Sequence, residues 1–261
     1  MELILERKKH RLFIVLTGIF ITNALVAEMI GIKIFSGEGT LGLAPANLDI
    51  LGFTMDFNLT AGAVIWPVVF ITSDLINEYF GQPGVKRISY LTAGLIAYAF
   101  VVIFLTMKLP PAGWWVEANS KDDQGNYFNM VYAFNKIFGQ GQRIIIGSLT
   151  AFLIGQLADV WIFQKLRKAT GPKKLWLRAT GSTLISQLID SFVVLFIAFS
   201  GTFSTTQIIA IGITNYIFKF TVAILLTPMV YAGHHIIDRY LGHEHAERIA
   251  DEAAQNSNKF L

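Results

Sequence analysis

Six long apolar segments dominate this chain and restrict it to a membrane-spanning architecture. A helix that crosses a bilayer needs about 20 mostly apolar residues. The segments close to that length are residues 12–32, 59–76, 88–107, 144–163, 179–200 and 208–231. Only 15% of the residues are charged, whereas soluble domains carry about 25%. The sequence therefore predicts an all-α integral membrane protein with six transmembrane helices.

The predicted spans leave little room for a second domain. We expect one six-helix transmembrane domain over residues 1–240 and a polar cytoplasmic tail over 241–261, frayed from Asp251 onward. The first span is too long for the apolar region of a signal peptide, and no small-residue cleavage site follows it, so it is not expected to be cleaved.

The distribution of Lys and Arg predicts the orientation. Fifteen of these residues fall in the two termini and the second and fourth connections, against five in the other three connections. Lys219 lies inside a span. Because cytoplasmic connections carry the excess of Lys and Arg, both termini of this multi-pass membrane protein are predicted to be cytoplasmic.

Two of the predicted outer connections are longer than simple turns. Residues 35–58 are rich in glycine and partly alternating, which is typical of a short hairpin or a re-entrant piece. Residues 110–142 contain Trp114 and Trp115, which suit the interfacial aromatic belt, and then the polar run 119–126. We interpret that run as an exposed loop tip, with a lid as the alternative.

Polar side chains inside the spans are the strongest functional signal. Ionisable groups in hydrocarbon cost several kcal/mol and usually mark a pathway or cavity. Acidic, basic or amide side chains occur in five of the six spans or at their ends: Asn23, Glu28, Asp74, Asn77, Glu78, Gln156, Asp159, Gln187, Asp190, Asn215 and Lys219. Helical rise places Asp190 and Lys219 roughly 14 to 16 Å from the cytoplasmic boundary, near the midplane. The pattern predicts a polar cavity there, and a peripheral, lipid-facing third span.

The alternative is a purely structural role, in which these groups hold the helices together. Asp190 and Lys219 could neutralise each other, with the amides acting between helices. A repeated motif favours a shared role, since Gln-Leu-x-Asp occurs at 156–159 and again at 187–190 in adjacent spans. The sequence leaves open whether these two motifs belong to an inverted repeat.

Other classes of function find little support in the sequence. Cysteine is absent, and no His lies in a span, which leaves an intramembrane enzyme only Ser, Asp and Lys chemistry. His234, His235, Asp238, His243 and His245 have metal-like content, but their spacing matches no known metal site and favours a solvated helix. We expect no metal, no cofactor and no nucleic-acid partner.

Several ordered motifs resemble those of the queuosine precursor transporters of bacterial inner membranes. They are Trp-Pro at 66–67, Thr-Ser-Asp-Leu-Ile-Asn-Glu-Tyr-Phe-Gly at 72–81, the stretch 143–163 with Gly-Gln-Leu-Ala-Asp, Leu-Trp-Leu-Arg at 175–178, and Gly-Ser-Thr-Leu-Ile-Ser-Gln-Leu-Ile-Asp-Ser at 181–191. The resemblance extends over about residues 12–231. It implies import of 7-cyano-7-deazaguanine and 7-aminomethyl-7-deazaguanine for tRNA modification. It also implies a six-helix fold similar to the binding subunits of energy-coupling-factor vitamin importers. No residue role is carried over from the family.

The chemistry of such a substrate fits the polar residues of the spans. A guanine-like edge offers two adjacent N–H donors, which a carboxylate can accept together. We predict that Asp190 or Asp159 reads this edge, and that Lys219 balances the carboxylate in the empty site. The other predicted substrate contacts are Gln156, Gln187, Asn23 and Asn215, with Trp66, Phe70, Trp161 and Phe218 as stacking candidates. Asp74, Glu78 and Glu28 are candidates for coupling or gating.

Three alternatives to the transport of deazaguanines stay open. The substrate could be another small vitamin or nucleobase, because a fold does not fix its substrate. An intramembrane enzyme is a second alternative, and a structural subunit a third. The sequence also leaves open whether the protein is a homo-oligomer, and whether transport is coupled to protons.

Overall fold

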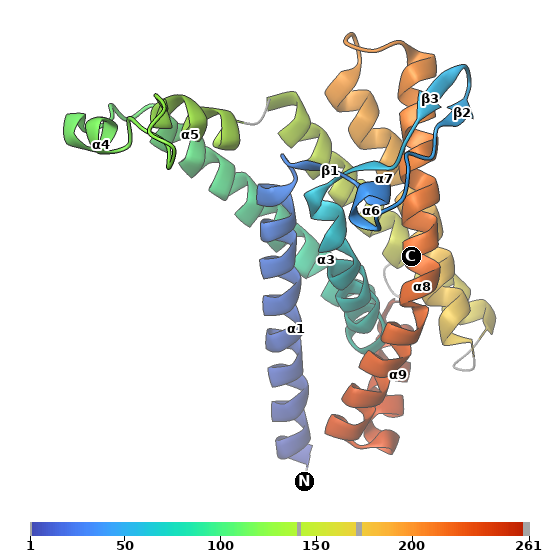
Figure 1. Cartoon of the computed structure of the whole chain (residues 1–261). Coiled ribbons are helices and arrows are strands. Elements are labelled where there is room, and N and C mark those ends of the chain that lie inside the picture. The colour runs from blue at the N-terminus through green and yellow to red at the C-terminus, as the bar shows by residue number, and fades with distance from the viewer. Residues whose placement is uncertain (1, 140–141, 171–173, 258–261) are drawn as a thin grey trace.

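The protein is a bundle of long helices with small ordered segments at one end. The computed structural model describes residues 2–139, 142–170 and 174–257. Among those residues, five helices are long and apolar enough to cross a membrane. They are α1 (Glu2–Ile30), α3 (Trp66–Met107), α6 (Gln142–Thr170), α7 (Leu175–Phe199) and α8 (Thr205–Leu241). Figure 1 shows the start of α1 and the last helix, α9 (His243–Ser257), at the end of the bundle opposite the strands.

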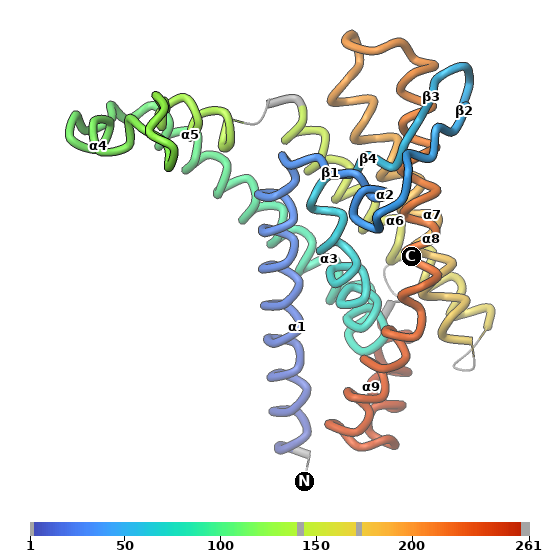
Figure 2. The backbone as a smooth tube through the Cα atoms, in the orientation of Figure 1, coloured from blue at the N-terminus to red at the C-terminus, as the bar shows by residue number. Residues whose placement is uncertain are grey.

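The difference between five helices and six predicted spans lies in α3. Gly81 has φ 66° and ψ −171° inside this 42-residue helix, a conformation that essentially only glycine adopts. Pro83 follows and cannot donate a helical hydrogen bond. The tube in Figure 2 reverses there, so α3 consists of two arms joined by a sharp bend. The spans predicted at 59–76 and 88–107 fall largely on these arms.

The start of the first arm also differs from expectation. Residues 59–64 belong to β4 (Asn58–Thr60) and a 3-10 turn (Ala61–Val64), so the helix begins only at Trp66. Pro67 therefore occupies the first turn, where its missing N–H leaves no helical bond unmade. It does not kink the span.

Gly81→Ala should destabilise the protein by about 1–3 kcal/mol, because alanine would be forced into a backbone conformation reserved for glycine. We expect a lower melting temperature of the purified protein in detergent. Gly94→Ala is the matched control, since Gly94 lies in the second arm of α3 and an added Cβ would meet nothing within 4 Å. Equal melting temperatures for the two variants would contradict a bend that requires glycine.

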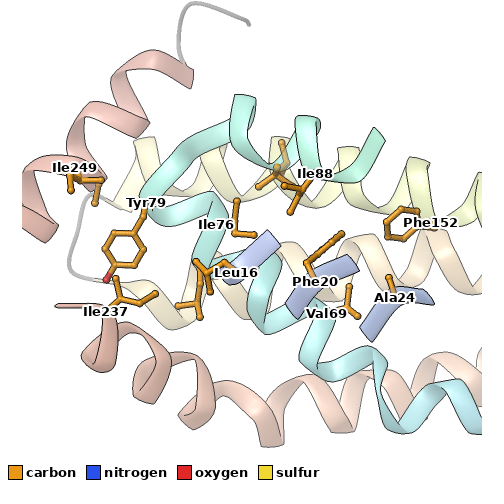
Figure 3. Packing of buried hydrophobic residues seen from close by; sticks show 14 of the residues in the cluster. Leu16, Phe20, Ala24, Val69, Ile76, Tyr79, Ile88, Phe152, Ile237 and Ile249 are labelled. Carbon is orange, nitrogen blue, oxygen red and sulfur yellow. The ribbon is translucent and has the colours of Figure 1, made fainter. Parts of the chain in front are cut away.

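The apolar core lies where α1, both arms of α3, and α6 meet. Phe20, Val69, Ile76, Ile88 and Phe152 are almost completely buried in it, and Figure 3 shows their side chains converging between the ribbons. Large apolar side chains are exposed elsewhere, including many on the second arm of α3, such as residues 98, 101 and 105. Exposed apolar faces of this extent suit a lipid environment and agree with the peripheral position expected of residues 88–107.

Small strands form the predicted short hairpin after α1. β1 (Ile34–Ser36) pairs with β4, and β2 (Leu48–Ile50) pairs with β3 (Phe53–Met55). Glu38, in the short helix α2 (Gly37–Thr40), holds the segment together: its Oε1 accepts from the Phe57 N–H at 2.8 Å and the Ala46 N–H at 3.4 Å. The Phe57 N–H lowers the pKa of the Glu38 carboxyl from its ordinary value.

The connection after α3 and the C-terminal stretch contain more helix than the sequence suggested. Residues 110–139 include α4 (Gly113–Ala118), which carries both tryptophans, and α5 (Met130–Phe138). The C-terminal stretch is helical to Ser257, so the expectation of fraying from Asp251 was wrong. The helix continues because one of its faces is apolar, with Ala246, Ile249 and Ala250 buried in the core. The many charged residues of α9 concealed this face in the sequence.

Candidate functional site

A cavity of about 680 Å³ opens among the long helices and reaches from the strands deep into the bundle. Its volume lies within the usual range for small-molecule sites. α7 lines it from Ala179 to Phe199, which is most of the helix, and α1, α3, α6 and α8 form most of the remaining wall, with residues of β1, β4 and α5 (Met130–Phe138) at the end near the strands. Most of the wall is apolar, and a few polar groups project from separate helices.

The best-defined polar feature is an ion pair between α7 and α8. Lys219 Nζ lies 2.5 Å from Asp190 Oδ2, and both side chains are about one-quarter exposed. Asn215, one turn from Lys219, also lines the cavity. Water or a ligand can therefore reach a carboxylate already held by a cation.

Two buried polar atoms belong to wall residues and lack a partner. Gln187 and Asp74 both line the cavity and are only 3% and 4% exposed. Neither Gln187 Oε1 nor Asp74 Oδ1 has a hydrogen-bond partner in the part of the chain that the structure describes. Buried polar atoms are nearly always paired, so these two indicate that a ligand or water completes the site.

Aromatic rings supply a flat apolar surface in the same wall. Trp66 and Phe70, one turn apart on α3, stack with centroids 5.8 Å apart and an interplanar angle of 19°. Phe218 on α8 lines the cavity as well. Trp161, the other stacking candidate, is 44% exposed and does not line the cavity. Its ring lies under Lys165 Nζ instead.

A second carboxylate, Glu28 on α1, reaches the cavity wall. Its Oε1 accepts a hydrogen bond of 2.5 Å from the Ser148 hydroxyl on α6, and both residues line the cavity. Sequence reasoning missed Ser148 because a serine inside a helix gives no signal of its own. Its position one turn after Ile144, the predicted start of that span, was the only hint.

Three predicted substrate contacts do not line the cavity. The Asn23 amide donates to the Ile19 carbonyl of its own helix at 2.8 Å. Gln156 Oε1 accepts from the Ser73 hydroxyl at 2.8 Å, and Asp159 Oδ1 accepts from the Ser186 hydroxyl at 3.1 Å. The two Gln-Leu-x-Asp motifs therefore differ in the structure. The second motif lines the cavity, whereas the polar pair of the first lies between packed helices.

Glu78 also lies outside the cavity wall, in a buried ion cluster. The Arg178 guanidinium donates to both carboxylate oxygens, at 2.7 and 3.0 Å, and Arg167 Nη1 lies 3.0 Å from Oε1. Glu78, Arg167 and Arg178 are between 1% and 6% exposed. From the sequence, both arginines were counted as positive charges of a cytoplasmic connection, and Arg178 was also noted in the Leu-Trp-Leu-Arg motif, but neither was predicted to be buried. Their arginine identity, beside several lysines, was the available signal, because the planar guanidinium suits buried carboxylates.

The residues with metal-like content contribute hydrogen bonds at the same end. His234 Nδ1 lies 3.0 Å from Asp238 Oδ2, and the Tyr79 hydroxyl donates to Asp238 Oδ1 at 2.7 Å. Among residues 2–139, 142–170 and 174–257, no group of three or more His, Cys, Asp or Glu side chains could hold a metal ion.

Comparison with known proteins gives a consistent set of similarities. The sequence matches the model of a family described as "Putative vitamin uptake transporter" over residues 60–233. A "Probable queuosine precursor transporter" from Bacillus subtilis (strain 168) is 30% identical over 226 residues, which cover 82% of this chain and 93% of the relative. The "Queuosine precursor transporter" of Escherichia coli (strain K12) is 30% identical over 187 residues, or 70% and 74% of the two chains. No solved structure matches the chain.

Proposed function

Because this chain belongs to the family of queuosine precursor transporters, we propose that it imports 7-cyano-7-deazaguanine, 7-aminomethyl-7-deazaguanine or both through the cavity between its helices. The family consists of transporters, so the protein is a multi-pass membrane transporter and not an enzyme. The observation that carries the proposal is the cavity itself, with Asp190, Gln187 and the Trp66–Phe70 stack in one wall.

The proposed recognition begins with Asp190. Its carboxylate accepts both adjacent N–H donors of the guanine-like edge in a bidentate geometry, whereas Lys219 contacts only Oδ2 in the empty cavity. Lys219 neutralises the carboxylate in the empty cavity and turns to the substrate carbonyl on binding. Gln187 contributes its unpartnered amide oxygen, and the flat ring stacks against Trp66 and Phe70. Asp190 rather than Asp159 is favoured because it lines the cavity.

The proposed topology has six crossings in the cell inner membrane and both termini in the cytoplasm. The bend at Gly81 divides α3 into two arms that run in opposite directions, and each arm makes one crossing. The excess of Lys and Arg at the end that carries the start of α1 and α9 supports a cytoplasmic location for that end. The cavity then opens toward the outside.

The substrate class is tested by ligand-dependent thermal stabilisation of the purified protein in detergent. We expect 7-cyano-7-deazaguanine to raise the melting temperature, because a ligand at 100 times its Kd stabilises the folded state by about 2.7 kcal/mol. Guanine is the control. The family description favours a vitamin as the second candidate. A folded protein that no deazaguanine stabilises would return the substrate to that class.

The orientation is testable with single thiols, because the chain contains no cysteine. Gln124→Cys places an exposed thiol in the loop after α4, and Glu244→Cys places one on α9. In intact cells, we expect a membrane-impermeant thiol reagent to label the first variant and spare the second. The opposite result would invert the proposed topology.

A further inference from the structure

The buried cluster of Glu78, Arg167 and Arg178 lies directly beyond the inner end of the cavity. On three helices, the wall residue nearest to this end lies within one turn of Glu78, Arg178 or His234, the histidine beside the cluster. Asp74 is followed by Glu78 on α3, Arg178 directly precedes Ala179 on α7, and Val230 is followed by His234 on α8. The cluster thus forms the floor of the cavity at the end of the bundle that carries α9.

One carboxylate holds this floor together. Glu78 on α3 binds Arg178 on α7 and Arg167 on α6, and Arg167 Nη1 also donates to the Glu78 carbonyl at 3.1 Å. His234 Nε2 on α8 lies 3.9 Å from Glu78 Oε1. Arg167 Nη2 lies 3.5 Å from Asp251 on α9, whose side chain is 67% exposed. The cluster therefore connects five helices between the cavity and the surface.

We infer that Glu78, Arg167 and Arg178 form the inner gate of the transporter, and that their ion pairs must separate for substrate to leave at this end. The inference rests on the proposed function, because a gate requires a cavity that conducts a substrate. Well-packed apolar residues often close a protein interior more stably than a buried ion cluster does. Charged groups have a different advantage here, since water can solvate each of them once the helices part.

The test uses a thiol inside the cavity of an otherwise cysteine-free protein. Ala223 lines the cavity and is partly exposed, so Ala223→Cys gives a small reporter with little change in volume. A membrane-impermeant thiol reagent is applied to vesicles of either orientation, with no substrate present. With the native cluster, we expect fast labelling from the outer face and slow labelling from the cytoplasmic face.

Removing the charge of Glu78 should open the floor. In the Glu78→Gln background, we expect cytoplasmic labelling of the reporter to accelerate on the order of tenfold or more, through a shift toward the open population. Arg167→Gln is a milder second variant that leaves the pair between Glu78 and Arg178 intact, should the first one fail to fold. Lys9→Gln is the matched control, because it removes a partly exposed ion pair with Glu252 at the same end without changing a contact of Glu78, Arg167 or Arg178.

Unchanged cytoplasmic labelling in folded Glu78→Gln and Arg167→Gln proteins would overturn the inference, since the cluster would then be a static brace. Acceleration in the Lys9→Gln control would overturn it as well, because loosening would then be general. The labelling needs no substrate, so it separates the gate from the proposed function. Faster labelling without deazaguanine uptake leaves the gate standing and removes the substrate, and unchanged labelling with normal uptake does the reverse.

Discussion

Asp190→Asn is expected to abolish tight binding of the deazaguanine while the protein remains folded. Asparagine matches aspartate in volume, but its amide offers one acceptor oxygen and an NH2 group that would face an N–H donor of the substrate. The variant therefore loses a charge-assisted bidentate interaction and leaves a donor unpaired. At about 1.5–3 kcal/mol per hydrogen bond to a charged group, the Kd should rise by roughly a hundredfold. Titration calorimetry and uptake of labelled substrate measure the effect.

The first Gln-Leu-x-Asp motif provides the matched control for this substitution. Asp159 occupies the same place in the first Gln-Leu-x-Asp motif, but its carboxylate bonds to Ser186 and does not line the cavity. We expect Asp159→Asn to change the Kd much less than Asp190→Asn does. Asp122→Asn, in the exposed loop after α4, should change neither binding nor uptake. Normal uptake by both Asp190→Asn and Asp159→Asn would refute the proposed recognition.

The long helices were predictable because a bilayer imposes a minimum apolar length on every crossing. The bend in α3 was not, since hydropathy carries no information about φ, although Gly81 and Pro83 punctuate the sequence between the two spans. The packing of α9 was also missed. Its apolar positions 246, 249, 250 and 253 follow a helical period, but three of them are alanines, which contribute little to a hydropathy profile.

The positions of the polar residues along their helices were predictable from the sequence, but the directions of their side chains were not. Helical rise places Asp190 and Lys219 at a similar level on their two helices, and the structure joins them in one ion pair. Gln156 lies at a similar level, yet its side chain points between helices toward Ser73. The rotation of each helix about its own axis decides between these outcomes, and it depends on tertiary packing that spacing along one helix does not contain. The same limit concealed the burial of Arg167 and Arg178.

Arg178→Ala should cause the largest loss of stability of any substitution at the inner end of the bundle. Arg178 is 1% exposed, and its guanidinium donates to both oxygens of Glu78. Truncation would leave the buried carboxylate with one guanidinium instead of two and a void beside it. Breaking a buried ion pair from one side costs about 3–5 kcal/mol. In a chain of this size, we expect the melting temperature to fall by on the order of 10 °C.

Two further variants give this result its meaning. Arg178→Lys keeps the charge but replaces the planar fork by a single ammonium group, so it should recover only part of the lost stability. Arg239→Ala removes an exposed cation from α8 at the same end and should change the free energy of unfolding by no more than about 0.5 kcal/mol. If Arg178→Ala had the same melting temperature as Arg239→Ala, the cluster would contribute no net stability, because water would solvate the Glu78 carboxylate in the folded protein. A fall confined to Arg178→Ala, partly restored by lysine, would show that the geometry of the pair stabilises the closed floor.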